Sequence, residues 1–213
     1  MSVPELLHRI REKCLINLQR LGLFSVKQAP APDLSVKVRP WLKSGTALPA
    51  DCYLEEATRV LAGQVAIFAL RPASLGVVPL WNTDPKSGVH APLTLGRALD
   101  YPNSEVVGDI KYLWEPNRHL QWVVLAQAYA LSRERRFLDG FAEQLSSWLE
   151  QCPYPLGPNW TSSLELGIRL INWSIVWQLI GGEQSELFEG RQGQELRQRW
   201  LGSIYQHCHS INL

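Results

Sequence analysis

The stretch GPNWTSSLELGIRLINW, residues 157–173, decides how this chain is interpreted. Its spacing predicts a helix that is apolar almost all the way round, with faces that carry Leu164, Ile168, Ile171 and, just beyond it, Ile175. Glu165, Arg169 and Asn172 nevertheless follow one another at intervals of four and three, which stacks them into one polar stripe. Burying charged groups is costly unless they are paired, so a polar stripe on such a helix needs a physical reason.

The composition limits the classes of partner. The chain has 213 residues, 46% of them hydrophobic, and its 21 basic and 20 acidic side chains leave a net charge of +1. A near-neutral chain lacks the basic surface that binds nucleic acids or anionic membranes, so neither is expected as a partner. Nine tryptophans are unusual. Most are expected in the core, although an indole face also stacks against sugar rings.

The four cysteines, Cys14, Cys52, Cys152 and Cys208, are widely separated and form no CxxC pair. This spacing signals neither a zinc site nor a redox motif, and we expect reduced, mostly buried thiols, no metal and no cofactor. Residues 1–22 lack a continuous apolar segment and no stretch reaches transmembrane length, so the default expectation from the sequence is a cytoplasmic chain.

Periodicity and turn residues predict a mainly helical chain in two parts. Residues 1–50 form the first, with an amphipathic helix from about residue 4 to Gly22, expected to dock on the body, and a proline-rich extended connection over residues 25–50. Residues 51–213 form the second, with a helix over 51–61, a short strand within 64–70, an irregular loop over 76–109 and helices over 117–132, 133–151, 162–180 and 194–212. Helices joined by short loops predict antiparallel pairs, as in repeats and toroids. The long loop is a candidate binding loop, because loops of this length are usually functional.

Two interpretations of the polar stripe stay open. Ser162 and Glu165 fit a capping box, and Glu165 precedes Arg169 in the order that favours a helical ion pair, so the stripe could be structural. The amides and indoles beside it, Asn159 and Trp160 among them, suit instead the recognition of a carboxylated sugar. In both cases we expect Glu165 and Arg169 within ion-pair reach, facing the concave side of the helical array.

Two further motifs carry polar and aromatic residues. DIKYLWEPNRHLQW, residues 109–122, places Glu115 and Arg118 three apart, which suits either a binding site or a helix start with Pro116 in its first turn and Glu115 near the positive end of the helix dipole. His119 is expected to be a hydrogen-bonded structural imidazole. WNTDPKSG, residues 81–88, supplies Trp81 and an Asp-Pro turn, which is also ordinary turn chemistry.

Taken in order, WNTDPKSG, DIKYLWEPNRHLQWVVLAQAYALS and GPNWTSSLELGIRLINW resemble the N-terminal helical domain of the heparinase II/III family of polysaccharide lyases, which includes alginate lyase relatives. The resemblance covers about residues 50–213. It implies a mainly α fold, an incomplete (α/α) toroid followed by a β-sandwich, and cleavage of uronic-acid glycans by β-elimination. In that chemistry an Asn neutralises the uronate carboxylate and a Tyr or His removes the C5 proton, without a metal. The resemblance also implies a periplasmic or secreted protein.

The chain departs from the family pattern at its end. The catalytic Asn-His segment of the family follows the helix that here reads SIYQHCHSINL, and the further Tyr and His come later, so no residue of this chain is expected to be catalytic. The expected substrate-binding residues are Trp81, Glu115, Arg118, Asn159, Trp160, Glu165, Arg169 and Asn172. Expected partners are an acidic polysaccharide, the rest of the toroid and the β-sandwich, and the apolar side of residues 194–212, with Trp200 and Ile204, is expected to lack a neighbour. The alternative function is a non-catalytic helical module that binds a glycan or a protein.

Overall fold

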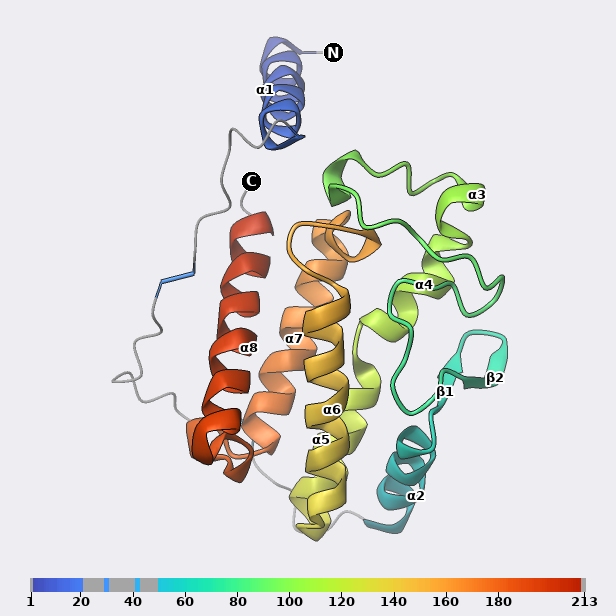
Figure 1. The fold of residues 1–213 in the computed structure, drawn as a ribbon, viewed down its shortest axis with the longest axis vertical. Helices are drawn as coiled ribbons and strands as arrows, with labels where there is room; N and C mark the ends of the chain where they lie inside the picture. Colours follow the sequence, from blue (N-terminus) through green and yellow to red (C-terminus); the bar gives the residue numbers. More distant parts are fainter. Residues whose placement is uncertain (1, 21–28, 31–40, 43–49, 212–213) are drawn as a thin grey trace.

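The computed structural model describes residues 2–20, 29–30, 41–42 and 50–211, and it is mainly helical, as predicted (Figure 1). Most of the extended connection expected over residues 25–50, and the expected helix stop at Gly22, lie outside the described residues. Among the helices that the structure describes, none is long and apolar enough to span a membrane.

The first helix, α1 (Val3–Arg20), forms as predicted, and the backbone N–H of Glu5 donates to the Ser2 hydroxyl at its start. Its expected docking on the body is not seen: Leu6, Leu7 and Ile10 are exposed, and Figure 1 shows α1 apart from the packed helices. The physical reason is that the helices of the body already cover their core by packing on one another. An amphipathic pattern shows that α1 has an apolar face, but it does not show which surface that face packs against.

The next elements are α2 (Ala50–Leu61) and a two-stranded antiparallel hairpin, β1 (Gln64–Ile67) and β2 (Leu70–Ser74). The prediction of one strand over 64–70 was therefore incomplete. The turn between the strands has Phe68 at a φ of 46°, a conformation that its sequence does not signal because Gly or Asn usually occupies it. Pro72 also argued against a strand at β2 in the sequence, because proline cannot donate a backbone hydrogen bond, although it is compatible with an edge strand.

The connection after the hairpin is irregular, as predicted for residues 76–109. It contains only one 3₁₀ turn, η1 (Gly96–Ala98), and a single helical turn, α3 (Ser104–Val107). Figure 1 shows it running over one end of the helical body. Short bridges pin it, one joining Thr83 to His90 and another joining Leu95 to Leu156.

The helix predicted over 117–132 corresponds to α5 (Leu120–Ser132), which begins three residues later than expected, and a separate helix that was not predicted, α4 (Ile110–Asn117), precedes it. Asp109 caps α4 by accepting a hydrogen bond from the backbone of Lys111, so Glu115 and Pro116 lie in the last turn of α4 and do not start a helix. The expected position of Glu115 near a positive helix end was thus wrong. His119, with a φ of 63°, separates the two helices.

Four helices form the body: α5, α6 (Arg135–Gln151), α7 (Ser163–Leu179) and α8 (Gly190–Ile211). α5 packs on α6 and α7, α8 packs on α7 and α6, and α2 covers α5 (Figure 1). The prediction for α6 is confirmed, including its buried face of Phe137, Phe141, Leu145 and Trp148. The short turns η2 (Pro158–Trp160), η3 (Gly182–Gln184) and η4 (Glu186–Phe188) complete the connections, and α8 begins four residues earlier than expected.

The core differs from expectation in three places. Trp200 is fully buried against Phe141, Trp173 and Trp177, so the prediction that it lacks a neighbour was wrong, and Ile204 packs against the same core. Two exposed apolar side chains, Leu164 and Ile171, lie instead on the outer side of α7. The four cysteines are thiols, but Cys14, Cys52 and Cys208 are exposed and only Cys152 is buried.

Candidate functional site

The end of α4 and the start of α7 are joined by an ion cluster. Arg118 donates from Nε and Nη2 to the two carboxylate oxygens of Glu165, at 2.9 and 2.8 Å, and from Nη1 to Glu115 at 2.7 Å. The side chain of Glu165 is 2% exposed, whereas those of Arg118 and Glu115 are 26% and 18% exposed. A bidentate pair between planar groups is a strong and directional contact, so this cluster fixes α4 against α7.

The partner of Glu165 is thus Arg118, 47 residues away, and not Arg169. The predicted Glu165–Arg169 ion pair is absent from the ion pairs of the described residues, and Ser162, although it precedes α7, makes no capping hydrogen bond with its side chain. The reason is that the chain turns at His119, where the two helices α4 and α5 meet. This turn places Arg118 close enough to donate two hydrogen bonds to the buried carboxylate of Glu165. The hydrogen bonds that Arg118 donates to Glu165 raise the pKa of Arg118, and the cluster of two carboxylates and one guanidinium carries a formal net charge of −1.

The buried polar stripe satisfies the last carbonyls of α4. A helix end leaves backbone carbonyl groups without partners inside the helix, and burying them unbonded is costly. The amide of Asn172 donates to the Arg118 carbonyl at 2.7 Å, Arg169 Nη1 donates to the Asn117 carbonyl at 3.4 Å, and Gln121 donates to the Pro116 carbonyl at 2.8 Å. The stripe therefore has a structural reason: it caps a helix that ends inside the protein.

Arg169 is fully buried and has no carboxylate partner among the described residues. Besides the Asn117 carbonyl, it donates from Nη2 to the Asn159 carbonyl and from Nε to His207 Nε2 at 3.0 Å, and its guanidinium lies 5.4 Å from the ring centre of Trp148. Burial lowers the pKa of Arg169 to about 10. The negative end of α4 and the π face of the indole supply the partial negative charge that stabilises this cation.

Two buried histidines lie beside Arg169, and hydrogen bonds fix their tautomers. His207 Nε2 accepts from Arg169, so its Nδ1–H donates to the Ser203 carbonyl at 2.7 Å. His119 Nδ1 accepts from the Trp173 indole at 2.9 Å, its ring stacks 3.5 Å from Trp122, and its Nε2 is buried without a hydrogen-bond partner. Burial, and then the charge of Arg169, hold the pKa of both histidines well below the ordinary value. The expectation of a structural, hydrogen-bonded imidazole at His119 agrees with this geometry.

Trp81, Asn159 and Trp160 are also buried, and the protein itself uses their polar atoms. The indole N–H of Trp81 donates to the Ser147 hydroxyl at 3.2 Å, and that of Trp160 donates to the Cys152 carbonyl at 3.1 Å. The amide of Asn159 donates to Asn82 Oδ1 and to the Cys152 sulfur, both at 3.2 Å. These three residues join the long connection to the end of α6, and Arg118 and Glu115 are the most exposed of the eight predicted residues.

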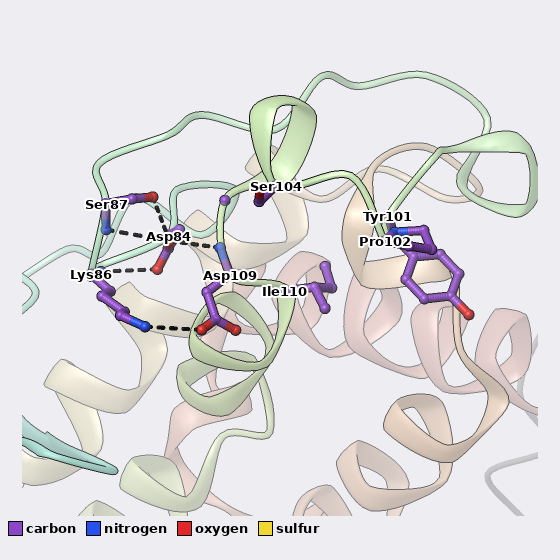
Figure 2. Close-up of a pocket in the computed structure, with 9 residues that line it drawn as sticks. Asp84, Lys86, Ser87, Tyr101, Pro102, Ser104, Asp109 and Ile110 are labelled. Carbon is purple, nitrogen blue, oxygen red and sulfur yellow. Dashed lines mark hydrogen bonds and ion pairs between the residues drawn. The ribbon is translucent and has the colours of Figure 1, made fainter.

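A surface hollow of about 490 Å³ lies within the long connection that the sequence marked as a binding loop. Figure 2 shows the Lys86 and Asp109 side chains directed toward each other on one wall, with Tyr101 and Pro102 on the opposite wall. Tyr101, Lys86 and Asp109 were absent from the predicted site. The only sequence signal for them was the length of the loop, because neither residue type nor spacing in an irregular segment shows which side chains will meet.

Asn117 and Asn82 were also missed, because a single buried amide has no periodic signature. Asn117 Nδ2 donates to the carbonyls of Trp81 and Leu113, and its Oδ1 accepts from the Trp148 indole at 2.9 Å. Asn82 donates to the Gln151 carbonyl at 2.7 Å. Both amides hold the WNTDPKSG segment to the helical body.

Comparison with known proteins identifies one family. The model described as "Heparinase II/III N-terminus" matches residues 61–187, which is more than half of the chain and includes the hollow, the ion cluster and all of α7. No curated protein matches the chain. No solved structure matches it either.

Proposed function

Because this chain belongs to the heparinase II/III N-terminus family, we propose that it is the helical N-terminal domain of a polysaccharide lyase that cleaves uronic-acid glycans, heparin-, heparan sulfate- or alginate-like, by β-elimination. In this proposal the chain forms part of an (α/α) toroid and contributes one wall of the sugar-binding groove. The family match carries the proposal, since it spans the three motifs at which polar and aromatic residues meet.

β-Elimination needs a group that neutralises the uronate carboxylate and a base that removes the C5 proton. Neither His119 nor His207 is suited to the role of base, because both are buried, fixed by hydrogen bonds and covered by tryptophans. The amides of Asn159 and Asn172 are likewise occupied by contacts within the protein. These facts support a positioning and binding role for this chain, with the catalytic groups supplied by another part of the enzyme.

The predicted site residues then divide by access. We propose that Arg118 and Glu115 border the polymer, since they retain exposed surface at the end of α4. Trp81, Asn159, Trp160, Glu165, Arg169 and Asn172 act by holding this wall in place, because they are nearly inaccessible to solvent. Ile110, Trp114 and Arg118 follow at intervals of four, so one side of α4 leads from the hollow toward the ion cluster.

The test is calorimetric titration of the purified 213-residue chain with oligosaccharides of alginate and of heparan sulfate. Carboxyl-reduced alginate, which keeps the polymer but loses its charge, is the matched control. The proposal expects saturable binding of a uronate polymer and at least tenfold weaker binding of the reduced one. The proposal is contradicted if the chain binds both polymers equally well or binds neither of them. Binding of a protein partner without binding of either polymer would favour the alternative, a non-catalytic helical module.

A further inference from the structure

The first helix, α1, carries an apolar stripe that the described part of the chain leaves uncovered. Figure 1 shows α1 apart from the packed helices of the body. The apolar side chains recur at intervals of three and four, so they lie along one side of the helix. The exposed members of this stripe are Val3, Leu6, Leu7, Ile10, Cys14 and Leu18. Contiguous exposed apolar surfaces are typical of interaction sites, so the stripe indicates a binding surface.

Two cations border the stripe, one along each edge. At about 100° per residue, Arg11 lies roughly 75° to one side of the centre of the stripe and Lys13 roughly 85° to the other side. Both residues are exposed. Glu5, by contrast, lies on the side of the helix opposite the stripe. Basic side chains in this position place their charge at the border of the apolar surface while their methylene groups extend that surface.

The charge of α1 differs from that of the rest of the chain. Its sequence contains four basic and two acidic residues, a net charge of +2, whereas the whole chain carries +1. The expectation that anionic membranes are not a partner rests on the whole-chain charge, so it does not apply to this segment. A helix with an apolar face and basic residues beside that face is typical of helices that lie in the interface of an anionic membrane.

The dimensions of α1 suit a position on a membrane surface. The 18 residues measure about 27 Å along the helix axis, and their charges rule out a path through the hydrocarbon layer. No helix in the described part of the chain is long and apolar enough to span a membrane. A helix that lies in the plane of the interface buries its apolar stripe and leaves its charged groups in water or among the lipid phosphates.

A second copy of this chain is a poorer partner for the stripe. Two α1 helices that paired through their stripes would bring the basic edges of one helix beside those of the other, because Arg11 and Lys13 border opposite edges. Like charges at the edges of a helix pair oppose association. An anionic phospholipid surface instead complements both edges at once, since it is flat and carries negative charge on either side of the helix.

We propose that α1 is an amphipathic anchor that lies on an anionic phospholipid surface, with Leu7 and Ile10 among the acyl chains and Arg11 and Lys13 at the phosphate groups. The anchor holds the helical body beside the membrane without crossing it. This role is independent of the proposed function, because it uses no residue of the ion cluster, the polar stripe of α7 or the long connection.

Co-sedimentation of the purified 213-residue chain with lipid vesicles tests the anchor. One set of vesicles is pure phosphatidylcholine, and the other is an equimolar mixture of phosphatidylcholine and phosphatidylglycerol. Binding to the mixed vesicles should be at least about tenfold tighter and should weaken as salt is added. Ile10→Gln should weaken binding to the mixed vesicles about tenfold, because it removes a buried apolar side chain, and Lys13→Gln should weaken it about fivefold.

Each variant has a matched control in the helical body. Ile171→Gln makes the same change at a residue of α7 that is as exposed as Ile10, 61% against 50%. Lys111→Gln removes the same charge as Lys13→Gln from an exposed residue of α4. Both controls should bind the mixed vesicles as tightly as the unaltered chain. Thermal melts verify that all four variants fold.

Three results would overturn the anchor. The first is no binding of the unaltered chain to the mixed vesicles, and the second is equal binding to the two sets of vesicles. The third is that Ile10→Gln and Lys13→Gln bind as tightly as their controls. Sedimentation velocity without lipid adds a further check: a dimer that Ile10→Gln abolishes would assign the stripe to a second copy of the chain instead of to a membrane.

Discussion

Arg118 and Glu165 form a bidentate ion pair that ties the end of α4 to the first turn of α7 across 47 residues of sequence. The carboxylate is buried and the guanidinium is three-quarters buried, so each group depends on the other to offset its loss of hydration. The pair lies directly beside the backbone break at His119, whose ring stacks on Trp122 within the tryptophan core.

Replacing Arg118 with Ala should therefore lower the free energy of unfolding by about 2–4 kcal/mol, because Glu165 would remain buried without a counter-ion. Urea denaturation at neutral pH measures this change. Arg191→Ala, which breaks an exposed pair with Glu195, is the control and should cost no more than about 0.5 kcal/mol. Equal effects of the two substitutions would show that the buried pair contributes no more than a surface pair.

Stability should fall as the pH is lowered below about 6.5, because His119 and His207 have pKa values well below 6.5 in the folded chain. The unfolded chain binds protons at these positions as the pH falls through 6.5 and the folded chain does not, so each histidine costs about 1.4 kcal/mol per pH unit below that value. Urea titrations between about pH 7.5 and 5.5 test the slope. His207→Gln should halve it, because one of the two histidines that stay unprotonated in the folded chain is removed. An unaltered slope in His207→Gln would contradict the assignment.

Two glycines in helices should respond in opposite directions to alanine. A Cβ at Gly193 would lie 2.5 Å from the Leu187 carbonyl oxygen, so Gly193→Ala should destabilise the chain by about 1–3 kcal/mol as α8 moves away from η4. Gly167 in α7 has open space around its Cβ position, so Gly167→Ala should stabilise by up to about 1 kcal/mol. Thermal melts compare the two, and a stabilised Gly193→Ala would disprove the close packing.

Trp160 should affect stability and not sugar affinity, since its indole is 2% exposed. Trp160→Ala should cost about 3–5 kcal/mol of stability, because it empties a large buried volume. The milder Trp160→Phe should fold and bind alginate hexasaccharide as tightly as the unaltered chain. A loss of affinity in folded Trp160→Phe, measured by calorimetry, would place the indole at the sugar after all.

The 213-residue chain alone should show no appreciable lyase activity, since elimination needs a carboxylate neutraliser and a positioned base together, and losing one usually costs orders of magnitude in rate. Ultraviolet absorbance of the unsaturated uronate product, with alginate and heparan sulfate as substrates, measures this. Robust turnover that disappears in a variant of this chain would show that the catalytic groups lie within it.

The sequence by itself determined most of the long helices and the family. Apolar periodicity located α6, α7 and most of α8, and three ordered motifs identified the heparinase II/III resemblance, because helical spacing and local motifs are properties of neighbouring residues. The spacing of Glu165, Arg169 and Asn172 also revealed a polar stripe, and all three side chains are buried.

Only the tertiary structure decided what that stripe contacts. The sequence suggested that Glu165 pairs with Arg169, since i and i+4 are neighbours on any helix, whereas the fold brings Arg118 to Glu165 and leaves Arg169 to cap the carbonyls of Asn117 and Asn159. The same contacts explain why Leu164 and Ile171 face outward. Helix α4 ends inside the protein, and its last carbonyl groups must be hydrogen-bonded there. Because the donors stand on the polar side of α7, that side faces inward and the apolar residues Leu164 and Ile171 are exposed.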